Sequence, residues 1–164
     1  MITLTRILVP HDFSETSEAA MQYATELART LGAKLHVLHV SEKARTDVAT
    51  EFPLGLEESM EAAVRERLLK IITTREAREL NPELELRSGT PSTEIVRYAT
   101  QRDINLIVMG THGRGFIAHA VMGSVAEKVV RNAPCPVLTV RNPDRGFLIP
   151  DAAAEKSALR DTAV

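Results

Sequence analysis

Five short runs of apolar and β-branched residues recur along the chain, and each is bounded by proline, glycine or polar residues. Runs of this length and composition predict β-strands. The expected strands are residues 6–10, 34–41, 84–89, 105–110 and 135–140. The runs at 7–9 and 106–109 are apolar at every position, which is typical of parallel strands covered on both faces. His36 and His39 stand three apart on the second run, so their side chains are expected to face opposite sides.

Between these runs, apolar residues recur at spacings of three and four, which predicts amphipathic helices. The expected helices are residues 14–32, 56–81, 92–102 and 124–133. The first has Ser14 as its expected N-cap and Gly32 as its C-terminal stop. The second is expected to be a single long helix that ends before Pro82, and residues 42–55 are expected to form a loop.

Strands and helices therefore alternate along the chain. This alternation predicts an α/β fold in which a parallel five-stranded sheet carries helices on both faces. We expect residues 1–141 to form this domain. Residues 142–164, with two prolines and a weakly amphipathic end, are expected to be a C-terminal extension of unknown role.

The composition argues against several classes of protein but does not indicate a function. The 164 residues suit one domain, and a net charge of -2 gives no reason to expect nucleic acid or an anionic membrane as a partner. No apolar segment reaches the roughly 18 residues of a membrane span, and the N-terminus lacks the pattern of a secretory signal. Because Cys135 is the single cysteine, no internal disulfide can form, and we expect a cytoplasmic protein.

Glycine is concentrated between the fourth expected strand and the last expected helix. Half of the eight glycines fall within fourteen residues there: Gly110, Gly113, Gly115 and Gly123. Backbone N–H groups of such a loop, together with those of the first helical turn, can form a cradle for an anion. The simpler alternative is that these glycines only make tight turns. No G-x-x-x-x-G-K-[ST] pattern is present, so a P-loop is excluded.

Two side chains strengthen the anion interpretation. Arg114 stands between two glycines, and a guanidinium group suits a phosphate, although a solvated loop arginine is the alternative. Ser124 follows Gly123, where its hydroxyl can donate to a ligand or cap the helix.

The spacing of Gly110-x-x-Gly113, nine residues and Gly123-Ser124 resembles the nucleotide-binding motif of the universal stress protein family. Three further stretches resemble other parts of this family: residues 7–15, 88–99 and 133–141. The resemblance covers residues 3–141, is poor over 42–55 and does not extend to the C-terminal extension.

This resemblance implies a Rossmann-like sheet of the HUP type with strand order 3-2-1-4-5. It implies that many members bind ATP while others do not, and members with an intact glycine motif mostly bind it. We therefore expect this chain to bind ATP, with ADP and AMP as alternatives, and Mg²⁺ to accompany the triphosphate. A role in stress response or signalling is implied, with slow or absent hydrolysis, and no catalytic residue is expected. The resemblance also implies a homodimer formed through the last strand, Pro136–Val140, and an apolar edge strand gives an independent reason to expect pairing there.

Carried over position by position, the resemblance places Asp12 beside the nucleoside and the backbone of Val40 beside the adenine. It assigns the phosphates to the glycine motif. The full set of expected nucleotide-binding residues is Pro10, His11, Asp12, Val40, Met109, Gly110, His112, Gly113, Arg114, Gly123, Ser124 and Val125. Phe13, a common alternative to glycine in this family, is expected to pack under the first helix.

Position 11 departs from the family pattern, in which a small or β-branched residue is usual. His11 can crowd the nucleoside or contact a phosphate. Together with Asp12 and His112 it can also form a metal site, but no helical spacing fixes these ligands, and a phosphate contact by His112 is favoured. Two other functions stay open: a nucleotide-independent dimeric interaction protein, which His11 favours, and a slow ATPase that uses His112 or Asp12.

Overall fold

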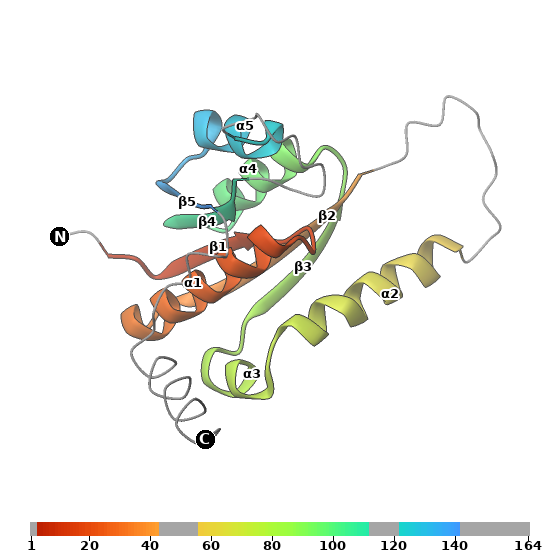
Figure 1. Ribbon diagram of the computed structural model, residues 1–164, viewed down its shortest axis with the longest axis horizontal. Helices are drawn as coiled ribbons and strands as arrows, with labels where there is room; N and C mark the ends of the chain where they lie inside the picture. Colours follow the sequence, from red (N-terminus) through yellow and green to blue (C-terminus); the bar gives the residue numbers. More distant parts are fainter. Residues whose placement is uncertain (1–2, 43–55, 112–121, 142–164) are drawn as a thin grey trace, which may run out of the picture.

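The five strands form one parallel sheet in the order β3-β2-β1-β4-β5 (Figure 1). The computed structural model describes residues 3–42, 56–111 and 122–141. The strands are β1 (Arg6–Pro10), β2 (Lys34–Ser41), β3 (Glu83–Ser88), β4 (Leu106–Gly110) and β5 (Val137–Val140). Each pair of neighbours runs parallel, which confirms the α/β class and the strand order that the resemblance implies.

Helices cover both faces of this sheet (Figure 1). The described helices are α1 (Glu15–Leu31), α2 (Leu56–Ile71), α3 (Thr74–Leu80), α4 (Pro91–Gln101) and α5 (Ser124–Asn132). Alternate residues of β1 point to opposite faces of the sheet and belong to two separate core clusters. Ile7 and Val9 pack in the cluster that contains α1, whereas Leu8 packs in the cluster that contains α4 and α5. All three side chains have no exposed area, as expected for a central strand.

Helix α1 begins and ends where its sequence predicts. The backbone N–H of Ser17 donates to the side chain of Ser14 at 3.3 Å, so Ser14 is the N-cap. Gly32 has φ of 64° and donates its N–H to the carbonyl of Ala28, which ends the helix in the left-handed conformation that favours glycine.

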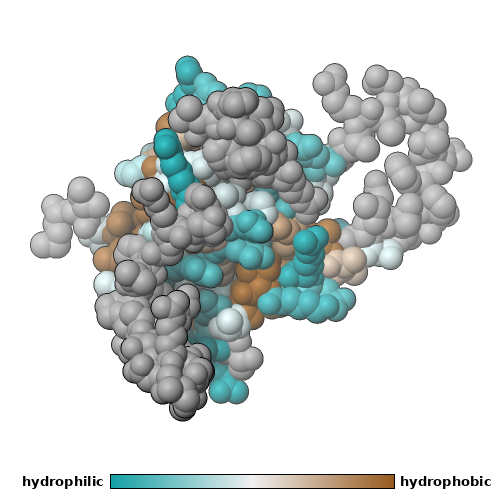
Figure 2. Space-filling view, viewed as in Figure 1, coloured by the Kyte–Doolittle hydropathy of each residue, from teal (hydrophilic) through white to brown (hydrophobic). Residues whose placement is uncertain are grey.

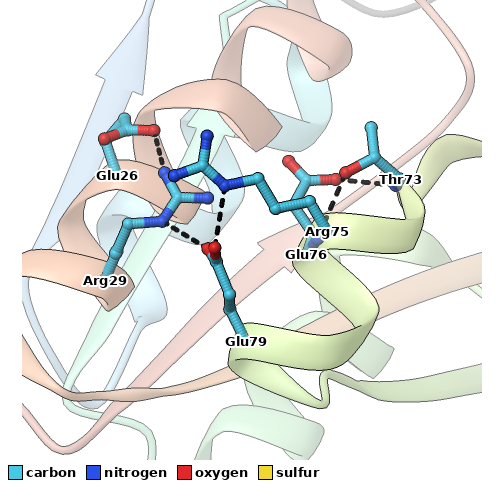
Figure 3. A network of polar contacts seen from close by, with 6 residues as sticks. All are labelled: Glu26, Arg29, Thr73, Arg75, Glu76 and Glu79. Carbon is cyan, nitrogen blue, oxygen red and sulfur yellow. Dashed lines mark hydrogen bonds and ion pairs between the residues drawn. The ribbon is translucent and has the colours of Figure 1, made fainter.

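The expected single helix over residues 56–81 is wrong, because the chain breaks at Ile72–Thr73 into α2 and α3. Thr73 and Glu76 form a capping box (Figure 3). The N–H of Glu76 donates to the Thr73 hydroxyl at 3.2 Å, and the N–H of Thr73 donates to the Glu76 carboxylate at 2.8 Å. The capping box therefore stabilises the start of a new helix at a point where the apolar spacing predicts that one helix continues.

A network of ion pairs joins α3 to α1 (Figure 3). Arg29 of α1 contacts Glu26 within its own helix and donates from Nε to Glu79 of α3 at 3.0 Å. Glu79 also accepts from Nε of Arg75 at 2.7 Å. Ion pairs of this exposure contribute modestly to stability, and the Arg29–Glu79 pair links α3 to α1.

Helix α2 packs loosely by comparison. Among its described side chains, Leu68 alone is fully buried, and Leu69 is 56 % exposed. Figure 2 shows apolar side chains at the surface between α1 and α2, in the centre of the view. Apolar surface therefore remains exposed beside α2. Within the described ranges, no helix combines the length and apolarity needed to cross a membrane.

We predict that Thr73→Ala lowers the free energy of unfolding by about 1 kcal/mol, because it removes one half of the capping box. Chemical denaturation followed by circular dichroism measures this change. Thr93→Ala, at an exposed position of α4, is the matched control and is expected to stay within about 0.5 kcal/mol of the parent. Equal stabilities for the parent and both variants would contradict a stabilising role for the cap.

Candidate functional site

A cleft of about 820 Å³ opens at the carboxyl ends of β1, β2 and β4. Open α/β sheets bind their ligands at this edge, and the volume lies within the range of small-molecule sites. Nine of the expected residues line the cleft: Pro10, His11, Asp12, Val40, Met109, Gly110, Gly123, Ser124 and Val125. The remaining three, His112, Gly113 and Arg114, fall outside the described residues.

Parts of the cleft wall were not predicted from the sequence. Helix α2 contributes Ala63, Val64 and Arg67, and the start of α4 contributes Pro91 and Ile95. The three residues of α2 occupy one face of that helix, at spacings of three and four. Such spacing predicts a common face but not what that face lies against, so their place in the cleft follows only from the packing of α2.

The turn after β1 fixes the carboxylate of Asp12. Its Oδ1 accepts from the backbone N–H of Ser14 at 3.1 Å and from the Ser14 hydroxyl at 2.5 Å. Burial alone would raise the pKa of Asp12, but the hydrogen bonds from Ser14 and Ser17 outweigh it, and the pKa is lowered. The cleft therefore holds a rigid, ionised carboxylate beside the N-terminus of α1.

Phe13 occupies the middle of the same turn with φ of 66°, in the left-handed region that favours glycine. Its ring lies 4.7 Å from the ring of His39 and 5.3 Å from that of His11, measured between centroids. The Arg67 guanidinium stacks over it at 4.2 Å. Phe13 thus packs in the apolar cluster of the α1 face, and it links the turn to α2.

His11 continues the pairing of β1 with β2 and lies almost wholly buried. Its backbone N–H donates to the carbonyl of Leu38 at 2.8 Å, and its own carbonyl accepts from Nδ1 of His39 at 2.8 Å. In its side chain, Nδ1 accepts from the N–H of Phe13 at 3.1 Å. Nε2 is buried and has no hydrogen-bond partner among the described residues.

Burial lowers the pKa of His11 to about 4, although the neighbouring Asp12 carboxylate acts in the opposite direction. The imidazole is therefore uncharged at neutral pH.

His36 faces the side of the sheet opposite to His39, as the strand spacing predicts, and its Nδ1 lies 2.9 Å from the hydroxyl of Tyr98 on α4.

The metal site considered from the sequence gains no support within residues 3–42, 56–111 and 122–141. No group of three His, Cys, Asp or Glu side chains suited to a metal ion occurs there. His112, the third member of the expected set, falls outside these residues. Nδ1 of His11 is already used as an acceptor for Phe13, which leaves that nitrogen unavailable as a ligand.

Gly110 is required by packing between α1 and β4. A Cβ atom at this position would lie 2.7 Å from the Thr16 hydroxyl oxygen and 2.9 Å from the Thr16 carbonyl carbon. The second contact is with backbone, so rotation of a side chain cannot relieve it. The absence of a side chain at Gly110 is thus explained by close approach of α1, without a phosphate.

Gly123 differs, because its φ of -69° and ψ of 152° are open to any residue. It is the N-cap of α5, and its N–H donates to the carbonyl of Thr111 at 2.6 Å. Ser124 is the first helical residue rather than a cap, and no described side chain caps this helix. The backbone N–H groups in the first turn of α5 therefore lie at the cleft without a described capping side chain. They stand next to Gly123, which has no side chain of its own.

Comparison with known proteins identifies the family. The model of the universal stress protein family matches residues 3–141, and the chain belongs to this family. It is 33 % identical over 147 residues to "Universal stress protein MJ0531" of Methanocaldococcus jannaschii, covering 85 % of this chain and 84 % of that one. The solved structure of universal stress protein UspA from Lactobacillus plantarum superimposes with a TM-score of 0.73 at 31 % identity, covering 85 % and 99 %.

Two similar structures are nucleotide complexes. A universal stress protein in complex with cAMP has a TM-score of 0.60 and 25 % identity, covering 83 % of this chain and 96 % of that one. The universal stress protein from Archaeoglobus fulgidus in complex with dAMP has a TM-score of 0.55 and 26 % identity, covering 85 % and 99 %. Both ligands are adenine nucleotides, so relatives with this fold bind that class of ligand.

We predict that the parent protein loses stability as the pH falls from about 7 to about 4.5, in part through His11. The folded pKa of about 4 lies below the unfolded value of 6.5, so the unfolded state binds more protons in this window. His11→Asn keeps an acceptor for Phe13 but cannot titrate. Its stability should fall by about 2–3 kcal/mol less than that of the parent over the same window.

Urea unfolding at both pH values measures this difference. His36 also has a pKa lowered by burial and is retained in both proteins, so its contribution cancels in the comparison. A parent and variant that lose equal stability on acidification would show that His11 protonates as easily in the folded chain as in the unfolded one.

Proposed function

We propose that the cleft binds an adenine nucleotide, with ATP as the expected ligand and ADP and AMP as alternatives. The observation that carries this proposal is the N-terminus of α5, which is capped by Gly123 and by no described side chain and which lines the cleft. Helix N-termini of this kind favour phosphate groups through their N–H donors and the helix dipole. The cAMP and dAMP complexes of relatives support the adenine nucleotide in particular.

Each part of the nucleotide has a candidate partner. The backbone N–H groups of Ser124 and Val125, next to Gly123, are proposed to bind the phosphates, and the resemblance adds His112, Gly113 and Arg114. The fixed carboxylate of Asp12 is suited to accept from ribose hydroxyls. The backbone of Val40, at the end of β2, is proposed to meet the adenine edge, and Pro10 and Met109 supply apolar surface.

The proposed role is regulatory rather than catalytic. The lowered pKa of Asp12 makes its carboxylate a weak base. Because no three-ligand cluster occurs among the described residues, Mg²⁺ is proposed to be held mainly by the phosphates and water. Nucleotide occupancy would then act in stress response or signalling, while a slow ATPase that uses Asp12 or His112 is the catalytic alternative.

Gly123→Val tests the proposal by isothermal titration calorimetry with ATP and Mg²⁺. We predict that the parent binds and that the variant binds at least about tenfold more weakly, because the added side chain occupies the space beside the first turn of α5. Asn132→Val, at the opposite end of the same helix, is the matched control and is expected to bind like the parent. Equal affinity for Gly123→Val and the parent would remove α5 from the site.

A homodimer through β5 is the proposed assembly, and it also underlies the second candidate function, an interaction protein that does not need a nucleotide. β5 is an edge strand of the sheet. Leu138 on it and Val130 on α5 are 39 % and 45 % exposed. An apolar strand with unpaired backbone groups favours pairing with a second copy. The buried imidazole at the cleft, His11, is the observation that favours a nucleotide-independent role.

We predict that Thr139→Pro converts the dimer into a monomer in sedimentation experiments. The carbonyl of Pro136 accepts from Ile107 of β4, and the carbonyl of Val140 accepts from Thr111, directly after β4. Backbone groups alternate in direction along a strand, so those of Thr139 point to the free edge. Proline removes the N–H at that edge while leaving the bonds to β4 in place. Thr139→Val retains the N–H and should stay dimeric. Dimers of equal strength in both variants would place the interface elsewhere.

A further inference from the structure

We infer that His11 is a ligand-binding residue whose Nε2–H donates a hydrogen bond to the nucleoside part of the bound nucleotide. This inference rests on the proposed function and goes beyond it, because it gives the residue that departs from the family pattern a defined contact. The same residue would otherwise have to be explained as an obstruction of the cleft.

The hydrogen bonds around the ring fix which nitrogen carries the proton. A backbone N–H can only donate, so Nδ1 of His11 must accept from Phe13 and is unprotonated. The neutral imidazole therefore carries its hydrogen on Nε2. This N–H is a donor for which the described residues provide no acceptor.

A buried donor without an acceptor is unusual, since most buried polar groups in folded proteins are paired. His11 is 2 % exposed and lines the cleft. His36 also has an unpartnered Nε2 and is 3 % exposed, but it packs against Tyr98 and does not line the cleft. The ligand interpretation applies to His11 because this residue lines the cleft, whereas His36 does not.

The position of the ring favours the nucleoside over the phosphates. His11 packs with Phe13 and His39 on the face of the sheet that carries α1 and α2. The proposed phosphate cradle belongs to α5, whose side chains pack on the opposite face. A nucleotide held by its phosphates at α5 and by its ribose at Asp12 would present sugar or base acceptors, rather than phosphate oxygens, to His11.

An acceptor can reach Nε2 only after a neighbouring side chain moves, because this atom exposes less than 1 Å². Arg67 is the neighbour best suited to move. It lines the cleft on α2, its side chain is exposed, and it is held over Phe13 by a cation–π contact, which is weak at exposed sites. We therefore place the opening between α2 and the turn after β1.

Two substitutions distinguish the roles of the two ring nitrogens. Isothermal titration calorimetry with AMP and with ATP measures the affinity of each variant. The His11→Asn side chain reaches only as far as Nδ1, so it keeps an acceptor for Phe13 and loses the donor. The His11→Gln side chain reaches the position of Nε2 and keeps a donor there. We expect His11→Asn to bind AMP and ATP about fivefold more weakly, by the same factor for both, and His11→Gln to bind within about twofold of the parent.

His36→Asn is the matched control, because it deletes the same unpartnered nitrogen away from the cleft and should leave both affinities unchanged. A loss in His11→Asn confined to ATP would move the contact to a phosphate and overturn the inference. Tighter binding by His11→Asn would show that the imidazole obstructs the cleft, and an equal loss in His36→Asn would show a general effect on folding. A parent that binds neither nucleotide would instead refute the proposed function itself.

Discussion

Burial of β1 and β4 on both faces is the constraint on which the rest of the structure depends. Apolar side chains on both sides of a strand require a helical layer on each side, since either face alone would remain in water. Each fully buried aliphatic side chain contributes about 1.5–3 kcal/mol relative to exposure. Ile7, Leu8, Val9, Ile107 and Val108 have no exposed area, so this requirement outweighs any surface interaction in the molecule.

The position of the cleft follows from that layering. Crossover helices on opposite faces must leave the carboxyl edge of the sheet, and α1 and α5 begin there on opposite sides. The close contact of Thr16 with Gly110 brings the start of α1 directly against the end of β4. The first turn of α5 and the turn at Asp12 therefore face one cavity, although more than a hundred residues separate them in the chain.

The strands and the start and end of α1 could be predicted because their signals are local or repeat at a fixed period. Nine of the residues that line the cleft were expected from the glycine pattern and from the family resemblance. The break between α2 and α3 was missed because Ile71 and Ile72 continue the helical spacing, while the competing signal is confined to Thr73 and Glu76. The role of Arg67 could not be predicted, since it depends on how α2 packs rather than on any pattern within α2. The same holds for Gly110, whose requirement becomes visible only when Thr16 is placed beside it.

His11 shows how the folding requirement and the proposed function compete at one residue. Folding keeps the imidazole neutral by burial, which lowers its pKa to about 4 and makes the folded chain less stable in acid. A smaller apolar residue at this position would avoid both this penalty and the unpartnered Nε2. Natural proteins retain such locally unfavourable groups chiefly at functional sites, where a ligand supplies the missing partner. The inferred contact with a bound nucleotide would supply the acceptor that Nε2 of His11 lacks among the described residues.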